Sequence, residues 1–515
     1  MFSCEQQKEF IRKADELTPQ LKRWVVNADA LVTPVEDKSV WQDYRMEPSN
    51  LDEFLANNDF ASGSSFIVKL PETTVGQLAF TITSPCGYAD SPSRLRITLG
   101  ELPQEVINAT KPYNGTLNGS WLQTEIINID NLPAEVVLPR RYSCKYIRFE
   151  MMAVPQKIKF SNIHLIACGA EDSLGEVDKN LSPILQKIDM ASLRTLRNCM
   201  QTCFEDGPKR DRRLWLGDLR LQAMVNKVSY KRFDLVKRCL YLHAGTLQHD
   251  GEVSGCVMEL PFPRKGCHTH DYSMLFGLVL EEYCRWSGDW QVGEELFDFA
   301  LYQMELMERF FENNLFIGEN DPYKDWFFVD HDLELDRQAP LQAHAIVGYR
   351  SLAKLADALG KTDKANELKV RVDELTQVAR EKFYDAENGV VVSGENKQIS
   401  YASQIWMIMA GVLSCEEGKK ALLAVENNPD AIKPSSPYMF HYLLEAWQIC
   451  GDEEHLMKLL EEYYGSMINH GADTFWEAYR PDEPFFSPYN DVRMNSACHA
   501  WSGTASYFIR KGYME

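Results

Sequence analysis

The chain has 515 residues, of which 45% are hydrophobic, so it holds enough apolar material for a large core and for more than one domain. Its 75 acidic and 54 basic side chains give a formal net charge of −21 at pH 7, which disfavours nucleic acid and anionic membrane surfaces as partners. Neutral or cationic small ligands are therefore expected. Composition leaves the formation of a homo-oligomer open.

The start of the chain does not read as a secretion signal. Residues 1–16 mix charged and single apolar side chains and contain no apolar core of a signal peptide. No uninterrupted apolar run approaches the ~20 residues that cross a bilayer. The 13 Cys residues form no CxxC pair and suit a reducing compartment. We therefore expect a soluble, cytoplasmic protein.

The N-terminal part of the chain is expected to begin with a helix and to continue as β structure. Residues 6–24 have the apolar spacing of an amphipathic helix, so 1–24 is assigned to an N-terminal helix. In residues 25–172, runs of alternating apolar and polar residues, such as 65–70, 95–99 and 146–150, lie between Pro, Gly and Asn clusters. Such closely spaced strands predict an antiparallel β-sandwich.

From residue 173 to residue 515 the apolar spacing becomes helical, and we expect an all-α domain. Helices joined by short loops pack as antiparallel hairpins, and about a dozen in series fit a six-hairpin (α/α)6 barrel. A linear solenoid is the alternative, but no repeat of roughly 34 or 40 residues is found. One further helix is expected in a weaker stretch, beside eleven windows: 183–203, 218–243, 271–286, 290–312, 338–359, 362–384, 400–413, 416–426, 438–450, 453–468 and 495–511.

A polar cluster at residues 205–218 crowds acids and guanidinium groups beside Trp215 and the turn formers Pro208 and Gly217. Pro208 cannot lie inside a helix, so the segment is predicted to be a loop before a helix that begins near Asp218. Loops on a rigid scaffold often carry catalytic groups. A salt-bridged loop that only joins two helices is the structural alternative.

A second cluster, at residues 473–479, places the carboxylate of Glu477 after two large aromatic residues. That pattern can set an acid against a sugar-like ring while excluding water. The structural alternative is a helix N-terminus, with Thr474 and Glu477 forming a capping box.

Together the two clusters resemble the α-L-rhamnosidases of glycoside hydrolase family 78, in a short, two-domain bacterial form. That family has β-sandwich modules before an (α/α)6 catalytic barrel, and its first signature reads Asp-Cys-Pro-x-Arg-Glu-Arg-x-Gly-Trp-x-Gly-Asp. The chain departs from this signature where Gly207 replaces Cys and where Asp211 replaces the Glu that serves as general acid. The positions that match are Asp206, Pro208, Arg210, Trp215, Gly217 and Asp218 in the first signature, and Thr474, Trp476 and Glu477 in the Thr-x-Trp-Glu signature.

The resemblance implies an inverting hydrolase with Asp211 as general acid and Glu477 as general base. An inverting pair stands roughly 6.5–9.5 Å apart to admit water. Asp206 or Asp218 as proton donor stays an alternative, because like-charged neighbours raise the pKa of any of these carboxyls. The expected substrate contacts are Asp206, Arg210, Trp215, Asp218, Asp271, Trp326, Trp476 and His499, of which Asp271, Trp326 and His499 rest on a weaker match.

No cofactor is expected. The segment His268-Thr269-His270-Asp271 does carry two imidazoles and a carboxylate that suit zinc, but no second His or Cys cluster with ligand spacing follows it. We therefore expect a metal-free carboxylate mechanism.

The predicted function is release of terminal α-L-rhamnose from small rhamnosides that have entered the cell. Two alternatives stay open. One is a non-catalytic carbohydrate-binding protein, which the retention of both carboxylates disfavours. The other is an (α/α)6 hydrolase or lyase that acts on another sugar.

Overall fold

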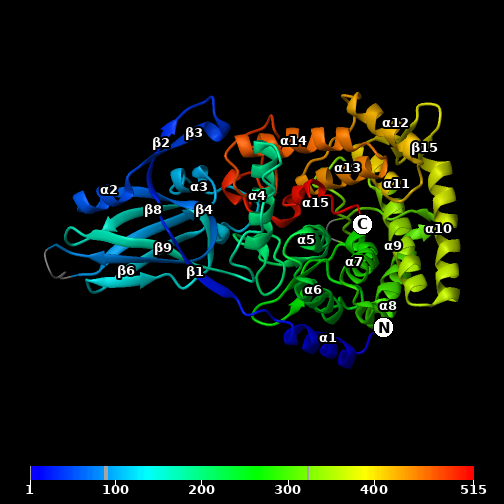
Figure 1. Cartoon of the computed structure of the whole chain (residues 1–515), viewed down its shortest axis with the longest axis horizontal. Coiled ribbons are helices and arrows are strands. Elements are labelled where there is room, and N and C mark those ends of the chain that lie inside the picture. The colour runs from blue at the N-terminus through cyan, green and yellow to red at the C-terminus, as the bar shows by residue number, and fades with distance from the viewer. Residues whose placement is uncertain (1, 86–90, 322–323, 515) are drawn as a thin grey trace.

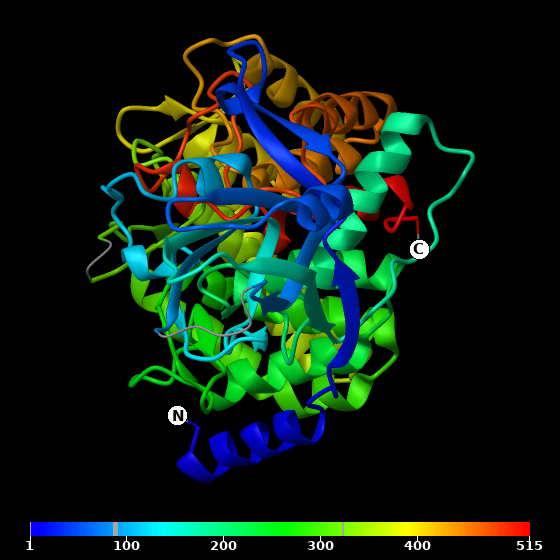
Figure 2. The same cartoon turned by 90° about the vertical axis from the view of Figure 1, so that its left-hand side faces the viewer.

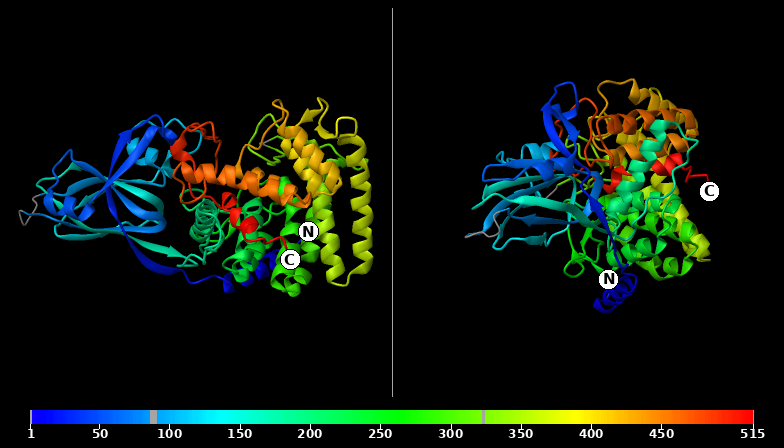
Figure 3. Two further views of the ribbon diagram at one scale, coloured as in Figure 1. Left: turned by 45° about the horizontal axis from the view of Figure 1, so that its top comes forward. Right: turned by 60° about the vertical axis from the view of Figure 1, so that its left-hand side comes forward.

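The computed structural model describes residues 2–85, 91–321 and 324–514. A β-rich region and a helical region lie side by side along the long axis of the molecule (Figures 1 and 3). Among the described residues, no helix is both long enough and apolar enough to span a membrane.

The first helix is shorter than its sequence predicts. Helix α1 (Cys4–Glu16) is capped by Ser3 and packs against helix α6, below the helical region in Figure 2. Pro19 then restricts the backbone and cannot continue a helix, and strand β1 (Lys22–Asn27) follows. The prediction of a helix as far as Trp24 is therefore wrong, because this Trp lies in a strand that pairs with β9.

The β-rich region is one antiparallel hydrogen-bonded network in the part of the chain that the structure describes. Strand β4 connects it, since β4 pairs with β2, β7, β8 and β9. The remaining strands and short helices are β2 (Ala30–Glu36), η1 (Trp41–Asp43), β3 (Tyr44–Ser49), α2 (Leu51–Asn57), β4 (Ser65–Thr83), β5 (Ser93–Gly100), α3 (Pro103–Ile107), η2 (Gly119–Trp121), β6 (Thr124–Ile129), β7 (Ala134–Val137), β8 (Tyr142–Ala153) and β9 (Lys159–Gly169).

Alternating apolar side chains fill the inside of this region. Phe66, Val68 and Leu70 of β4 are buried together with residues two apart in β5 and β8. This is the period that the sequence shows, because successive side chains of a strand point to opposite faces. The predicted strands at 65–70, 95–99 and 146–150 are confirmed within β4, β5 and β8.

The helical region consists of consecutive helix pairs. The window 218–243 is two helices, with a break after Val228, and the last helix begins at residue 505 instead of 495. The pairs are α4 (Pro183–Cys199) with α5 (Leu216–Val228), α6 (Phe233–Gly245) with α7 (His270–Ser287), α8 (Trp290–Met307) with α9 (Gln338–Ala358), α10 (Thr362–Phe383) with α11 (Tyr401–Met409), α12 (Cys415–Glu426) with α13 (Pro437–Ile449), and α14 (Glu453–Asn469) with α15 (Ala505–Ile509).

The second helices of the first five pairs pack against one another in succession. Contacts run from α5 to α7, α9, α11 and α13 in turn. The short turn η5 (Ala500–Ser502) then contacts both α13 and α5, so the succession returns to its start. The segments that precede α5, α7, α9 and η5 hold the residues of the site described next, together with short strands such as β10 (Leu214–Trp215), β11 (Cys256–Met258) and β12 (Arg264–Lys265).

Candidate active site

A cavity of about 240 Å³ opens among these segments. Seven residues that the sequence singles out line it: Asp206, Asp211, Trp215, Asp218, Trp326, Glu477 and His499. The cavity is completed by six that it does not: Thr269, Tyr272, Phe328, His331, Tyr489 and Trp501. Both clusters, distant in sequence, therefore meet in one place.

The loop that carries Asp211 is tightly folded, as its sequence predicts. The Asp206 amide donates to the Arg213 carbonyl at 2.9 Å, and the Arg213 amide donates to Asp206 Oδ1 at 3.0 Å. At the tip, Asp211 (φ 61°) and Arg212 (φ 50°) both adopt the left-handed conformation. Consecutive non-glycine residues in that region are uncommon and cluster at functional sites. The strain places the Asp211 carboxylate at the cavity, where 20% of its side chain stays exposed.

Two glycines explain how the loop packs. A Cβ on Gly207 would lie 2.8 Å from Ser496 Oγ and 3.2 Å from His499 Nδ1, so the Cys of the family pattern would require these side chains to shift. A Cβ on Gly217 would lie 2.4 Å from the ring of Tyr272. Close approach at both positions brings Asp206 and Asp218 against neighbouring segments.

Glu477 lies on an irregular segment, so the structural alternative, a helix capped by Thr474, is not what the chain forms. The Thr474 hydroxyl donates to the Ala497 carbonyl at 2.7 Å. The Glu477 amide donates to the Ser496 carbonyl at 2.9 Å, and the Ser496 amide donates back to Glu477 Oε2 at 3.1 Å. Tyr489 adds a third contact, because its hydroxyl donates to Glu477 Oε1 at 2.5 Å.

Arg210 lies behind the cavity, between the two predicted catalytic carboxylates. Its guanidinium donates to Glu477 Oε2 and, at 3.0 Å, to Asp211 Oδ2, while its Nε donates to the Met494 carbonyl. The ring of Tyr489 lies 4.4 Å from the guanidinium carbon. Arg210 is buried and does not line the cavity, so it orients the two acids without facing the ligand space.

The carboxyl groups of the cavity differ in their pKa. Burial raises the pKa of Glu477, but Arg210, His499 and the Tyr489 hydroxyl outweigh it and lower this pKa to about 2. Burial, with the charges of Asp211 and Asp218, raises the pKa of Asp206 well above its usual value. Burial also raises the pKa of Asp218, whose Oδ1 lies 3.4 Å from His499 Nε2. One carboxylate is thus held ionised beside others that favour protonation.

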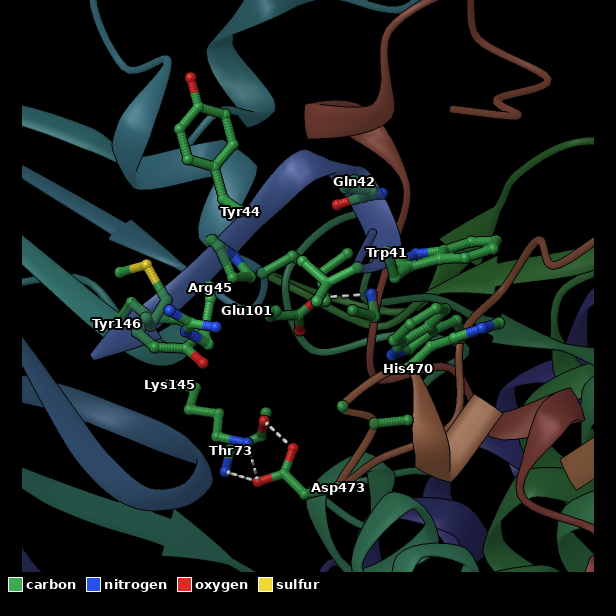
Figure 4. A pocket seen from close by; sticks show the side chains of 18 of the residues that line it. Trp41, Gln42, Tyr44, Arg45, Thr73, Glu101, Lys145, Tyr146, His470 and Asp473 are labelled. Carbon is green, nitrogen blue, oxygen red and sulfur yellow. Dashed lines mark hydrogen bonds and ion pairs between the residues drawn. The ribbon is translucent and has the colours of Figure 1, made fainter. Parts of the chain in front are cut away.

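Aromatic rings form two walls of the cavity. Trp215 and Trp326 meet edge to face, with centroids 6.4 Å apart. Trp476, in contrast, does not line this cavity. It packs 5.9 Å from Trp41 and faces a second cavity of about 390 Å³, shown in Figure 4.

Asp271 is fully buried and also lies outside the cavity lining. Its two carboxylate oxygens accept the amides of Phe328 and Val329, each at 3.0 Å, and Thr269 donates to it as well. Val329 has φ 52°, an outlier for a β-branched residue. Asp271 therefore stabilises the loop that presents Phe328 to the ligand space.

The two histidines near Asp271 lie against a different carboxylate. Glu252, His268 and His270 offer ligand atoms within 4.8 Å of one another. Arg309 and Ser273 already donate to Glu252, at 2.7 Å each. A cation bound there would have to compete with the Arg309 guanidinium.

The lining residues that the sequence does not single out lie in the segments between helices or in the first turn after them. Thr269 and Tyr272 adjoin Asp271, and Trp501 follows His499 by two positions. The aromatic side chains of Tyr272 and Trp501 are a signal in the sequence, but they do not tell which residues face a common space.

A helical domain with a pocket of carboxylates and aromatic side chains is typical of glycoside hydrolases. Two family models match the chain. The glycosyl hydrolase family 78 alpha-rhamnosidase N-terminal domain matches residues 28–168, and the bacterial alpha-L-rhamnosidase 6 hairpin glycosidase domain matches residues 179–512. The chain therefore belongs to the α-L-rhamnosidases of glycoside hydrolase family 78, and it is a glycoside hydrolase.

Solved structures agree with this membership. A rhamnosidase from Klebsiella oxytoca with rhamnose bound is 37% identical, with a TM-score of 0.94 and 98% of each chain covered. A family 78 rhamnosidase of Bacillus sp. GL1 is 18% identical, with a TM-score of 0.74; 90% of this chain and 49% of that chain are covered. An α-L-rhamnosidase from Streptomyces avermitilis complexed with L-rhamnose is 15% identical, with a TM-score of 0.67, covering 96% and 44%. The last two show a shared fold. No curated protein matches.

Proposed function

We propose that the enzyme hydrolyses small α-L-rhamnosides with inversion, with Asp211 as general acid and Glu477 as general base. We further propose that residues 25–172 form a β-sandwich and that residues 173–515 close into an (α/α)6 barrel. The Klebsiella oxytoca rhamnosidase, whose structure holds rhamnose, supports the choice of sugar.

The observation that carries the proposal is the single guanidinium of Arg210 between Asp211 and Glu477. It fixes both carboxylates relative to each other from behind the cavity. The general acid and the general base act on opposite faces of the sugar ring, so their carboxyl groups must be held apart and in a fixed relative position.

Glu477 suits the base because a base must be ionised before it accepts a proton. Its pKa of about 2 keeps it ionised at neutral pH. Asp211 suits the acid because it stays partly exposed, whereas Asp206 and Asp218 are only 3% and 1% exposed. The leaving group needs access to solvent beside the residue that protonates it.

Asp211 gives its proton to the glycosidic oxygen while the bond from that oxygen to the anomeric carbon breaks. A water molecule forms the new bond to the opposite face of that carbon, and Glu477 takes the water proton. Asp206, Asp218 and His499 hold sugar hydroxyls by hydrogen bonds, which are stronger where one partner is charged. Solvent then returns each carboxyl group to its starting state.

Leaving-group dependence tests which acid donates the proton. We expect Asp211→Asn to lose roughly 10²- to 10⁴-fold in kcat/KM on a rhamnosyl disaccharide but under roughly tenfold on p-nitrophenyl α-L-rhamnoside, whose phenolate leaves without protonation. Asp206→Asn and Asp218→Asn should affect both substrates alike. If the split appears in Asp206→Asn instead, that residue is the donor.

Proton NMR of the first product tests the stereochemistry. Inversion of an α-rhamnoside gives the β anomer before mutarotation, and an initial α anomer would contradict the proposed course. Wild-type enzyme that binds rhamnose but hydrolyses neither substrate would point to a binding protein. Hydrolysis of another glycoside in preference to both would point to a different sugar.

A further inference from the structure

Lys209 lies two residues before Asp211, yet its side chain turns away from the cavity and toward the β-rich region. The side chain is fully buried, with 0% exposure. Burying an ammonium group is costly unless it is paired and hydrogen-bonded. This position is variable in the family pattern, so the signature itself assigns it no role.

All three ammonium donors of Lys209 have acceptors. Nζ donates to Glu105 Oε2 at 2.9 Å, to the Arg493 carbonyl at 3.0 Å and to the Asn495 carbonyl at 2.6 Å. A lysine has three donors, so the group is saturated. The contacts join the Asp211 loop, helix α3 of the β-rich region and the segment 493–497.

Hydrogen bonds hold the carboxylates of Glu105 and Glu101, both in the β-rich region, in place. Glu105 Oε1 accepts the amides of Glu101 and Leu102, each at 3.0 Å. Glu101 accepts the Ala497 amide at 2.5 Å and the Ser143 hydroxyl at 2.6 Å, and its Oε2 lies 4.0 Å from Lys209 Nζ. Glu101 also borders the second cavity, as Figure 4 shows.

Segment 493–497 also contacts Glu477, the proposed base, and Arg210. Met494 accepts from Arg210, and Ser496 exchanges two hydrogen bonds with Glu477. The segment that Lys209 clamps is therefore the one that positions the proposed base, and Lys209 belongs to the loop of the proposed acid.

We propose that Lys209 is a positioning residue: it ties the Asp211 loop and segment 493–497 to Glu105, so that the β-rich region sets the separation of Asp211 and Glu477. The proposal rests on the acid and base roles proposed above. It gives the β-rich region a part in catalysis although none of its residues lines the cavity.

A single substitution mixes two effects. Burial raises the pKa of Glu101 to about 7, with Lys209 opposing this shift. Removing the lysine therefore leaves Glu101 and Glu105 without their cation and destabilises the fold whatever its role in geometry. Lys209→Met should be compared with Lys209→Met/Glu105→Gln, because the second change removes the charge of Glu105, the carboxylate that accepts directly from Lys209.

The double variant distinguishes a role in charge neutralisation from a role in positioning. If Lys209 only neutralises buried charge, the double variant recovers both stability and kcat. If it positions the acids, stability recovers while kcat stays roughly 10- to 100-fold low, because a displacement of about 1 Å can cost 10²-fold. KM for p-nitrophenyl α-L-rhamnoside should change under roughly threefold, since the cavity lining is intact. A double variant with wild-type kcat would overturn the proposal.

Glu72→Gln provides the matched control. Glu72 accepts from Arg194 at 2.8 Å and from Arg197 at 2.7 Å across the same interface, without touching Lys209 or segment 493–497. We expect it to lower stability and to leave kcat within roughly twofold. An equal loss of kcat in this control would show that any weakening of the interface suffices and would overturn the specific role of Lys209.

Hydrogen exchange gives a readout that does not need activity. In Lys209→Met/Glu105→Gln, the amides of 206–213 and 493–497 should exchange at least roughly tenfold faster, while those of α9 stay unchanged. Unchanged protection would overturn the clamp even if the wild type proved inactive on rhamnosides. Inactivity of the wild type with faster exchange in the variant would instead reject only the proposed function.

Discussion

Trp476 and Glu477 are neighbours in sequence but face two different cavities. Glu477 lines the smaller one, of about 240 Å³, where the carboxyls of Asp206, Asp211 and Asp218 converge. Trp476 lines the larger one, of about 390 Å³. There the carboxylate of Asp473 is already paired with Lys145, at 3.2 Å. Size therefore does not identify the site of chemistry, whereas several carboxyl groups that converge on one space do.

The two cavities also differ in what covers them. Trp41 lies at the tip of the β2–β3 hairpin, and His470 directly follows helix α14. Their rings stack 4.4 Å apart beside the larger cavity (Figure 4). Trp476 is thus enclosed by the β-rich region and packs as a core residue. In an irregular segment, successive side chains can take opposite sides, and neighbouring residues can then have unrelated roles.

Replacing each neighbour in turn tests this contrast with the largest expected effect. Glu477→Gln should lower kcat by roughly 10³-fold or more on both aryl and sugar leaving groups, because a general base contributes to every substrate. Trp476→Phe should change kcat and KM under roughly threefold and should lower the melting temperature instead. Steady-state kinetics and thermal unfolding measure both. A tenfold rise of KM in Trp476→Phe would show that this ring does reach the substrate.

Tyr489→Phe should remove one hydrogen bond to Glu477 in the smaller cavity and leave both carboxyl groups in place. The hydroxyl stabilises the ionised form of Glu477, so its loss raises the pKa of Glu477 from about 2 toward its ordinary 4.5. Because the pKa of Glu477 is lower in the native state than in the unfolded state, its ionisation stabilises the fold above pH 4.5. This stabilisation is lost as the pH falls from 4.5 to about 2. The acid limb of the pH profile of kcat/KM should therefore shift to higher pH, and kcat should be roughly tenfold lower.

The pH profile of the variant decides the origin of this effect. Rates from about pH 4 to pH 8 should show the limb entering the range in Tyr489→Phe and lying below it in the wild type. An unchanged limb with a lower kcat would mean that Tyr489 acts on the sugar and not on Glu477.

Much of this architecture is readable from sequence because it follows local periodicity. The alternation in β4 and the apolar spacing of the helical windows survive in the structure. The break between α5 and α6 was missed because no Gly or Pro marks it. There Lys231 adopts φ 55° and donates to the Asn226 carbonyl, while the Asn226 side chain accepts the Arg232 amide.

The site is only partly readable for a related reason. Motif spacing brings Asp211 and Glu477 into consideration, but the direction of a side chain in a loop depends on distant partners. Tyr489 reaches Glu477 from a segment without periodic pattern, and Asp271 turns toward the amides of Phe328 and Val329. Trp476 is taken out of the cavity by Trp41, which is over 400 residues away in the chain.

Asp271→Asn should give a moderate effect, because it alters a wall of the smaller cavity. An amide offers one acceptor where the carboxylate offers two, so one of the amides of Phe328 and Val329 would face an NH₂ group. Such an unsatisfied donor costs about 1–3 kcal/mol. We expect that loss of stability, with KM roughly fivefold higher and kcat within roughly twofold, because the acids stay in place. Asp332→Asn, in the same loop but outside the lining of the smaller cavity, is the control. A large loss of kcat in Asp271→Asn would mean that this carboxylate bonds the substrate directly.

Removal of metal ions should have the smallest effect. Glu252, His268 and His270 are close enough to hold a cation, but Glu252 is fully buried and bonded by Arg309 and Ser273. Its pKa is lowered below its usual range: burial opposes this shift, but His268 and His270 outweigh it. Charge balance there needs no ion, and the group lies outside the lining that holds Asp211 and Glu477. Dialysis against a chelator should therefore leave kcat within about twofold, whereas a loss that zinc restores would contradict the proposed mechanism of two carboxylates alone.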